Sequence, residues 1–466
     1  MATSPKRTNS GCWWAAAGGR QPLPELLTSG LDEQISLIVD HGNGVPGAMR
    51  ERVLLVHQVN SGAVLDEDFA ELEGLALSAG ALVVGRVPAS RHTPHPSTFV
   101  GSGKSREIAH RVQEQQVDLV IIDQAISPVQ ERNLESAVGC RVIDRTRLIL
   151  DIFALRARTS EGKMQVELAQ LKHLSTRLIR GWTHLERQRG GIGLRGPGET
   201  QLESDRRMLG QRIRVLQKRL QRVGAQRGLR RRRRKRVPIP TVTLVGYTNA
   251  GKSSLFNRLV SAEAFAADQL FATLDPTMRK LQLPTFGAVV LSDTVGFITG
   301  LPHTLVQAFQ STLEEIASSS LLLQVADDSD SDLREREAEV DRVLGEIGAL
   351  DLPRICVRNK IDLSGRAAGR VSSGNDPATV RICAQSGAGV DDLLAAMAEV
   401  LGRGRAARVL RIPPEQPRLR ANVYRLAEVA AESIDAEGHW LLQVIVDPTV
   451  TGRLEAQKDF EPCFWR

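Results

Sequence analysis

Residues 241–254 read TVTLVGYTNAGKSS and contain the element that decides the fold. The run Thr241–Val245 predicts a buried strand, and Gly246–Ser253 matches the phosphate-loop pattern GxxxxGK[ST] at every defined position, before a helical pattern that starts at Ser254. In this order of strand, loop and helix, backbone N–H groups surround the phosphates, Lys252 reaches the β and γ oxygens, and the Ser253 hydroxyl ligates Mg²⁺. The predicted phosphate-binding residues are Gly246, Tyr247, Thr248, Asn249, Ala250, Gly251, Lys252 and Ser253.

The base is specified by a second motif, Asn359-Lys360-Ile361-Asp362, which follows the strand-like run 354–357. In phosphate-loop GTPases such a segment presents an aspartate to the guanine N1–H and exocyclic amine, a donor pair that adenine lacks. Loss of such a bidentate pair of hydrogen bonds costs about 1–3 kcal/mol, so we expect GTP rather than ATP. The loop beside the base is predicted at Cys383, Ala384 and Gln385, where many GTPases have Ser-Ala-Lys.

Two further segments have the spacing of GTPase switches. The strand-like run 288–292 ends in Asp293-Thr294-Val295-Gly296, so Asp293 is expected to bind Mg²⁺ through water and the Gly296 N–H to sense the γ-phosphate. The segment Phe271-Ala272-Thr273-Leu274-Asp275 falls where switch I belongs. We predict Thr273 as the second hydroxyl ligand of Mg²⁺, with Thr277 as the alternative.

The predicted catalytic residues are Lys252, Thr273 and Gly296. The residue after Gly296 is unusual for a GTPase. Phe297 stands where Ras-like GTPases place a glutamine that orients the attacking water. Phenylalanine cannot hydrogen-bond that water, so we expect slow intrinsic turnover and a partner that completes the catalytic site.

The rest of the chain surrounds this GTPase domain. The length of 466 residues exceeds what one core usually serves. The expected fold is α/β: a phosphate-loop GTPase domain with a mixed sheet flanked by helices, preceded by a small α/β domain and a long antiparallel helical hairpin, and followed by a small α+β C-terminal domain. The predicted boundaries are 1–50 for a disordered extension, 51–145 for the N-terminal α/β domain, 146–237 for the hairpin with its basic linker, 238–403 for the GTPase domain and 404–466 for the C-terminal domain.

The N-terminal domain contains a run that resembles a phosphate loop without completing one. Gly101–Ser105 resembles the end of a phosphate loop, but Thr98 replaces the required first glycine.

The hairpin is predicted from two apolar stripes. Leu209, Ile213, Leu216, Leu220 and Val223 advance by four and three, the seam of one helix packed on another, and a matching stripe runs from Met164 to Leu178. Between the helices, residues 181–200 are rich in glycine, and Arg187, Arg189 and Arg195 are candidates for RNA contact, with disorder as the alternative. The basic run 230–236 fits either a solvated linker or contact with RNA or a membrane surface.

Composition limits the cellular compartment in which the protein is expected and its relation to membranes. No apolar stretch is long enough to span a bilayer, so we expect no transmembrane segment, and peripheral membrane association stays open. Five widely spaced cysteines without a CxxC pair favour a reduced compartment and argue against structural zinc. We therefore expect a cytoplasmic protein, taken as a monomer.

These motifs together resemble those of the HflX family of ribosome-associated GTPases. The resemblance covers about 51–450 and rests on the runs 98–104, 191–203 and 271–276, with the phrases Gly296-Phe297-Ile298 and Leu301-Pro302-His303. It implies binding of the large ribosomal subunit and the 70S ribosome, with the glycine-rich loop near ribosomal RNA of the peptidyl-transferase centre. It also implies GTP-dependent splitting of stalled or idle ribosomes under heat or antibiotic stress.

Two other functions remain open from the sequence. One is a GTP-regulated factor that binds or assembles the large subunit without splitting ribosomes. The other is an ATP-driven RNA remodeller, since the family is said to hydrolyse ATP through its N-terminal region. Residues 1–50 and the tail 460–466 have no counterpart in the resemblance.

Overall fold

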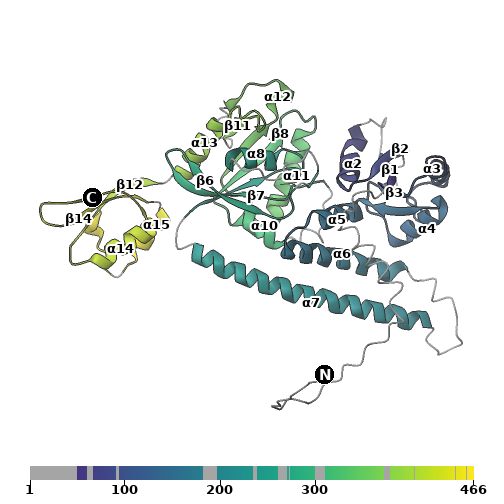
Figure 1. Cartoon of the computed structure of the whole chain (residues 1–466), viewed down its shortest axis with the longest axis horizontal. Helices are drawn as coiled ribbons and strands as arrows, with labels where there is room; N and C mark the ends of the chain where they lie inside the picture. Colours follow the sequence, from purple (N-terminus) through teal and green to yellow (C-terminus); the bar gives the residue numbers. More distant parts are fainter. Residues whose placement is uncertain are drawn as a thin grey trace, which may run out of the picture. The chain divides into compact units, whose positions relative to one another are not determined.

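A computed structural model (Figure 1) describes residues 50–59, 67–90, 94–181, 197–234, 239–260, 270–271, 273–299, 310–371, 378–403, 405–446, 448–457 and 459–465. Residues 1–49 of the predicted N-terminal extension and the RNA-contact candidates Arg187, Arg189 and Arg195 lie outside these ranges, as does Ala272. None of the helices so described is both long enough and apolar enough to cross a membrane.

The N-terminal α/β domain is a four-stranded parallel sheet in the order β2-β1-β3-β4. Its strands are β1 (Arg52–Val59), β2 (Leu82–Ser90), β3 (Leu119–Ile122) and β4 (Arg141–Asp144), and its helices are α2 (Glu67–Ser78), α3 (Ser102–Glu114), α4 (Pro128–Val138) and α5 (Arg145–Arg156). Local sequence sets the ends of α4: a capping box joins Ser127 and Gln130, and Gly139 ends the helix at φ 78°. The phosphate-loop-like run Gly101–Ser105 opens α3, where Lys104 is ion-paired with Glu107 at 2.7 Å.

The helical hairpin consists of α6 (Ser160–Gly181) and α7 (Pro197–Arg234), which pack side by side (Figure 1). Their seam contains most of the predicted apolar residues, with the buried residues Leu168, Leu171, Leu209 and Leu216 at its centre, whereas Val223 lies outside this cluster. The C-terminal part of α6 is held by polar contacts: Arg177 bonds Asp144 at 2.6 Å and also pairs with Glu131. The hairpin is therefore anchored on the N-terminal domain as well as packed on itself.

The GTPase domain is a seven-stranded mixed sheet in the order β10-β11-β9-β8-β5-β7-β6, with β6 and β10 antiparallel to their neighbours. Its strands are β5 (Thr241–Val245), β6 (Thr277–Leu283), β7 (Gly287–Asp293), β8 (Leu321–Asp327), β9 (Arg354–Asn359), β10 (Gly369–Val371) and β11 (Thr379–Arg381). Its helices are α8 (Lys252–Val260), α10 (Gln310–Ala317), α11 (Leu333–Glu346), α12 (Ile361–Ser364) and α13 (Val390–Gly402). This fold agrees with the class predicted from the sequence.

The two faces of this sheet have different partners. Leu255 of α8 and Leu393 of α13 share one buried cluster with one face. On the other, Ile316 of α10 and Val340 of α11 belong to a cluster that continues into the N-terminal domain through Phe153. The two domains thus share a hydrophobic core.

The C-terminal domain is a three-stranded antiparallel sheet in the order β12-β14-β13. Its elements are β12 (Ala406–Ile412), α14 (Pro417–Leu426), β13 (Glu428–Ile434), β14 (Trp440–Val446), α15 (Pro448–Glu455) and the short 3₁₀ helix η3 (Pro462–Phe464). Phe460 and Phe464 of the tail are buried in its core. The unfamiliar tail sequence is therefore part of this domain's packing.

Candidate nucleotide-binding site

The phosphate loop joins β5 to α8, and its backbone has positive φ angles at three residues. Gly246, Asn249 and Gly251 have positive φ values of 147°, 59° and 87°. A Cβ on Gly246 would lie 2.1 Å from the Val325 carbonyl oxygen, and one on Gly251 would lie 2.2 Å from Asn359 Nδ2. The two glycines of the motif are therefore needed because β8 and the base-reading segment approach the loop closely.

Lys252 is the first residue of α8, and its ammonium lies inside the loop. Nζ donates to the Gly246 carbonyl at 3.0 Å and to the Tyr247 carbonyl at 2.6 Å. Burial lowers the pKa of Lys252 to about 8, and the nearby Asp293 carboxylate partly opposes this shift. A buried ammonium that is satisfied mainly by carbonyls is well suited to a polyanionic ligand, which would further favour its charged form.

The predicted magnesium ligands converge. Ser253 Oγ lies 2.7 Å from Thr273 Oγ1, and the two hydroxyls donate to Asp293 Oδ2 at 2.8 and 3.0 Å. Asp293 Oδ1 is buried and accepts no hydrogen bond from any described residue, and burial raises the pKa of this carboxyl. Two hydroxyls around a carboxylate with an unused oxygen are the hard oxygen donors that Mg²⁺ prefers. Of the two threonine candidates, Thr273 joins this cluster, whereas Thr277 begins β6.

The segment after β7 is bonded to the phosphate loop. The Phe297 N–H donates to the Gly246 carbonyl at 3.1 Å, and the Thr248 N–H donates to the Phe297 carbonyl at 2.7 Å. A Cβ on Gly296 would lie 2.9 Å from Lys252 Nζ, so this position has no room for a side chain. The Phe297 ring is only 2% exposed and lies in the core shared with the N-terminal domain, so it offers nothing to an attacking water.

The base-reading segment is fastened to the phosphate loop through one side chain. Asn359 donates from Nδ2 to the Ala250 carbonyl, and its Oδ1 accepts the Ala384 N–H, both at 3.0 Å. Lys360 has φ 64° and pairs with Asp327 at 2.8 Å, Ile361 is buried, and Asp362 is exposed in α12. An exposed carboxylate on this short helix is free to meet a ligand, which is what the predicted guanine contact requires.

The loop predicted beside the base contains a buried thiol. Cys383 is 3% exposed, and its Sγ accepts the Ser386 N–H at 3.4 Å. The sulfur thereby accepts a backbone bond within the loop, as a serine hydroxyl could at that position. Gln385 is exposed, so the loop presents a neutral side chain at this position.

Much of the predicted switch I contacts the N-terminal region. The Phe271 ring packs edge-on against Phe153 of α5, with centroids 4.7 Å apart, and Leu274 is buried. The Asp275 carboxylate accepts the backbone N–H groups of Arg158 and Thr159 at 2.9 and 2.8 Å, just before α6. Phe271 and Asp275 of the predicted switch I thus have partners outside the GTPase domain.

The motifs give no sign of one further network, centred on Tyr247. Its hydroxyl donates to Glu71 Oε1 at 2.7 Å and accepts the Thr299 N–H at 2.8 Å. Arg145 bonds Glu71 at 2.9 Å and the Thr299 carbonyl at 3.2 Å, and Arg336 lies over the Tyr247 ring. Position 247 is a free choice in the phosphate-loop pattern, so only the fold shows that this tyrosine joins the loop to the N-terminal domain.

Comparisons with known proteins agree with this architecture. The N-terminal region of GTP-binding GTPases matches residues 66–154, their middle region matches 156–234, and the 50S ribosome-binding GTPase family matches 241–360. The chain is 52% identical to the GTPase HflX of Escherichia coli over 396 residues, covering 84% of this chain and 93% of the relative. It is 45% identical to the GTPase HflX of Magnetococcus marinus over 395 residues, covering 84% and 90%.

A solved structure of a GTP-binding protein from Sulfolobus solfataricus, in complex with GDP, is 25% identical, with a TM-score of 0.41 over 76% of this chain and 99% of that one. The identity to the curated relatives is high and extends over most of their length. The chain therefore belongs to the HflX family of GTPases and is an enzyme that hydrolyses GTP.

Proposed function

We propose that this enzyme is a cytoplasmic factor that binds the large ribosomal subunit and uses GTP to split stalled or idle 70S ribosomes under heat or antibiotic stress. The observation that carries the proposal is the match of residues 241–360 to a family described as 50S ribosome-binding GTPases, within a chain 52% identical to an HflX GTPase. The geometry of the nucleotide site supports GTP hydrolysis with Mg²⁺, and the basic surface of α7 supports binding to ribosomal RNA.

Magnesium and GTP are bound, in this proposal, by the residues that the fold brings together. Ser253 and Thr273 ligate Mg²⁺ through their hydroxyls, and Asp293 holds it through water. The ion would neutralise charge on the β- and γ-phosphates. Lys252 binds the same phosphates, the Gly296 N–H meets the γ-phosphate, and Asp362 reads the guanine edge.

The burial of Phe297 supports an external activator. The water that attacks the γ-phosphate must be oriented by some hydrogen-bonding group, and the Phe297 side chain lies in the core. A group supplied from outside is worth about 10³–10⁵ in rate in related enzymes. Turnover of the protein alone is therefore slow, and the ribosome supplies what residue 297 lacks.

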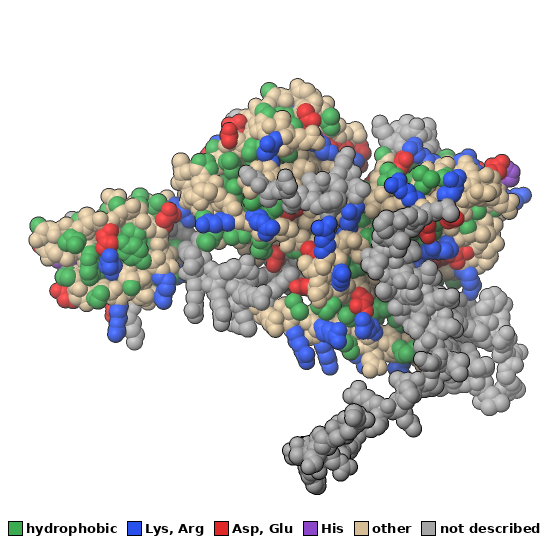
Figure 2. Space-filling model, viewed as in Figure 1, with side chains coloured by type: hydrophobic (Ala, Val, Ile, Leu, Met, Phe, Trp, Pro, Cys, Tyr) green, Lys and Arg blue, Asp and Glu red, His purple; other side chains and the backbone are tan. Residues whose placement is uncertain are grey.

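The outer face of α7 supports contact with ribosomal RNA. Arg214, Lys218 and Arg222 follow one another at intervals of four residues, so they share one side of the helix, and all three are exposed. Lys and Arg side chains project from the surface over this hairpin (Figure 2). Such a row suits a phosphate backbone, and Arg187, Arg189 and Arg195 of the glycine-rich loop would extend the contact.

The first experiment measures GTP hydrolysis by the pure protein, with and without 50S subunits, together with pelleting on ribosomes in GTP and in GDP. A large stimulation by 50S subunits and pelleting that depends on the nucleotide are expected. Equal rates with and without subunits would show that no ribosomal activator completes the site.

A second experiment tests the RNA surface. Neutralising Arg214, Lys218 and Arg222 together should weaken 50S binding and reduce its salt slope by about 0.9 for each phosphate that the variant no longer neutralises. Neutralising Arg187, Arg189 and Arg195 should do the same. A matched control is Arg342→Ala, which removes an exposed arginine of α11 that pairs within its own helix. If the triple variants and the control bind alike, the RNA contact lies elsewhere.

Sedimentation separates the proposal from the alternatives. Incubating 70S particles with the protein and GTP should yield free subunits; intact 70S particles with bound protein would indicate a binding or assembly factor. ATP hydrolysis that survives Lys252→Ala would demand a second nucleotide site and favour the ATP-driven RNA remodeller.

A further inference from the structure

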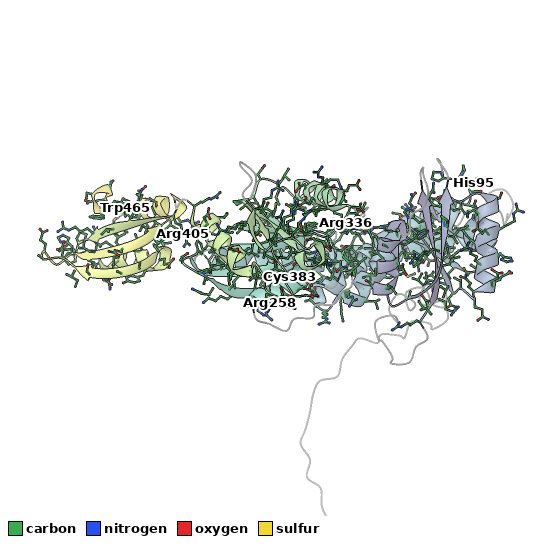
Figure 3. All side chains as sticks on the ribbon, turned by 90° about the horizontal axis from the view of Figure 1, so that it is seen from above. His95, Arg258, Arg336, Cys383, Arg405 and Trp465 are labelled. Atoms are coloured by element: carbon green, nitrogen blue, oxygen red, sulfur yellow. The ribbon has the colours of Figure 1, made fainter. Side chains whose placement is uncertain are left out.

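Arg258 lies outside every GTPase motif but contacts the loop beside the base. It is on α8, the helix that begins at Lys252, and its Nε donates to the Ala384 carbonyl at 3.1 Å. The terminal NH2 group donates to the Gln385 carbonyl. Figure 3 shows Arg258 beside Cys383, the first residue of this loop.

The loop backbone is folded around this guanidinium. Gly387 has φ 89°, and a Cβ there would lie 3.4 Å from the central carbon of the Arg258 guanidinium. A larger residue at 387 would be strained by its positive φ, and its Cβ would touch the guanidinium at ordinary contact distance. The close approach, the two accepted bonds and the glycine together make a built contact rather than a chance meeting of exposed side chains.

Ala384 shows what this contact does. Its N–H is bonded by Asn359 of the base-reading motif, and its carbonyl is bonded by Arg258 of the phosphate-binding helix. Both backbone polar groups of one loop residue are therefore fixed by side chains from two different elements. The loop forms its own turn, in which the Gly387 N–H donates to the Cys383 carbonyl at 2.8 Å. The two side-chain bonds to Ala384 add to this turn and connect it to the base-reading motif and to α8.

The loop sequence lacks a cation that many GTPases have at this place. Where many GTPases have lysine, the third loop residue is Gln385, whose side chain is uncharged. Arg258 places a cation against the loop from α8 instead, and a planar fork can bond two neighbouring carbonyls at once.

We propose that Arg258 is a positioning residue for guanine-nucleotide binding: it holds loop 383–387 in the conformation that retains the base and ties that loop to the phosphate-binding helix. Arg258 acts through the loop backbone and not on the reacting phosphates. Its removal therefore accelerates loss of the nucleotide without changing the rate of the bond-breaking step.

The test is stopped-flow dissociation of fluorescent GDP and of a fluorescent non-hydrolysable GTP analogue from the full chain. Arg258→Ala is expected to speed dissociation of both by about tenfold, the effect of losing about 1.4 kcal/mol of charge-assisted hydrogen bonding. Arg258→Lys, which can reach one carbonyl, should fall between this variant and the parent. The kcat at saturating GTP should stay within about twofold while KM rises.

Arg342→Ala is the matched control and should leave both dissociation rates unchanged. Melting of each variant without nucleotide separates positioning from folding. Unaltered dissociation from Arg258→Ala would overturn the proposal, and so would a fall in kcat at saturating GTP equal to the fall in kcat/KM. If Arg258→Ala fails to fold, Arg258→Lys decides, because parental dissociation rates from a stable Lys variant would show that the two-carbonyl fork is not required.

Discussion

Asp275 provides a stringent test of how switch I is joined to the hairpin. Its Oδ2 accepts the N–H groups of Arg158 and Thr159, and its Oδ1 accepts the Thr159 hydroxyl at 2.5 Å. That hydroxyl in turn accepts the Gly162 N–H at 2.9 Å, so Thr159 is the N-cap of α6. Asp275→Ala removes three bonds and leaves the cap without the acceptor that orients it.

The size of the effect follows from these hydrogen bonds. They are at the surface, where water replaces missing partners, so the cost is that of removing a helix cap, about 1–2 kcal/mol. Local opening of the first turn of α6 should become about 5- to 30-fold more frequent. Asp275→Asn keeps one carbonyl acceptor, so its effect should be smaller.

Hydrogen exchange measured by NMR or mass spectrometry is the assay. The amides of Gly162 and Lys163 should exchange faster in Asp275→Ala, while amides at the hairpin seam around Leu216 should keep their rates. Unchanged exchange in the first turn of α6, or an equal increase at Leu216, would refute the argument that Asp275 specifically holds this helix start.

Other predictions concern single groups. Lys252→Ala removes the phosphate-facing ammonium and should weaken GDP and GTP by about 10- to 100-fold in fluorescence titrations. Asp293→Asn removes a carboxylate whose pKa burial raises, so the metal-free protein should melt at a higher temperature while GTP hydrolysis needs more Mg²⁺. Burial, with the charge of Arg147, lowers the pKa of His173 to about 4. Stability should therefore fall as pH drops from about 6.5 towards 4, by up to ~3 kcal/mol in urea titrations, and His173→Gln should flatten this slope.

Where a local sequence pattern determines the structure, the fold could be predicted from the sequence alone. The strand, loop and helix at 241–260 follow from hydrophobicity and glycine placement, and the α6–α7 seam follows from helical spacing. The phenyl ring of Phe297 is apolar and buried, as its chemistry predicts. In each case the decisive interaction connects residues close in the chain or repeats at a fixed period.

The contacts between the domains could not be predicted in this way. The Thr159–Asp275 bond joins residues 116 positions apart, and the Tyr247–Glu71 bond joins residues 176 apart. The participants are polar residues outside any repeat, at positions where a motif allows many residue types. The packing of the domains on each other, including Phe153 of α5 against Phe271, brings these segments within reach of each other.

These contacts bear on how a distant partner acts on GTP hydrolysis. Switch I is bonded to the start of α6 through Asp275, and the segment after Gly296 is bonded to α5 through Arg145 and Thr299. Ordering of switch segments by the γ-phosphate changes the free energy of any contact that those segments make. Such coupling is reciprocal. If a ligand of the hairpin or of α5 changes the affinity for the nucleotide by some factor, the nucleotide changes the affinity for that ligand by the same factor. If the ribosome binds the hairpin, as proposed above, it would thus bias the switches without touching the nucleotide. The proposed activator of hydrolysis differs, because it would have to bring a hydrogen-bonding group to the γ-phosphate itself.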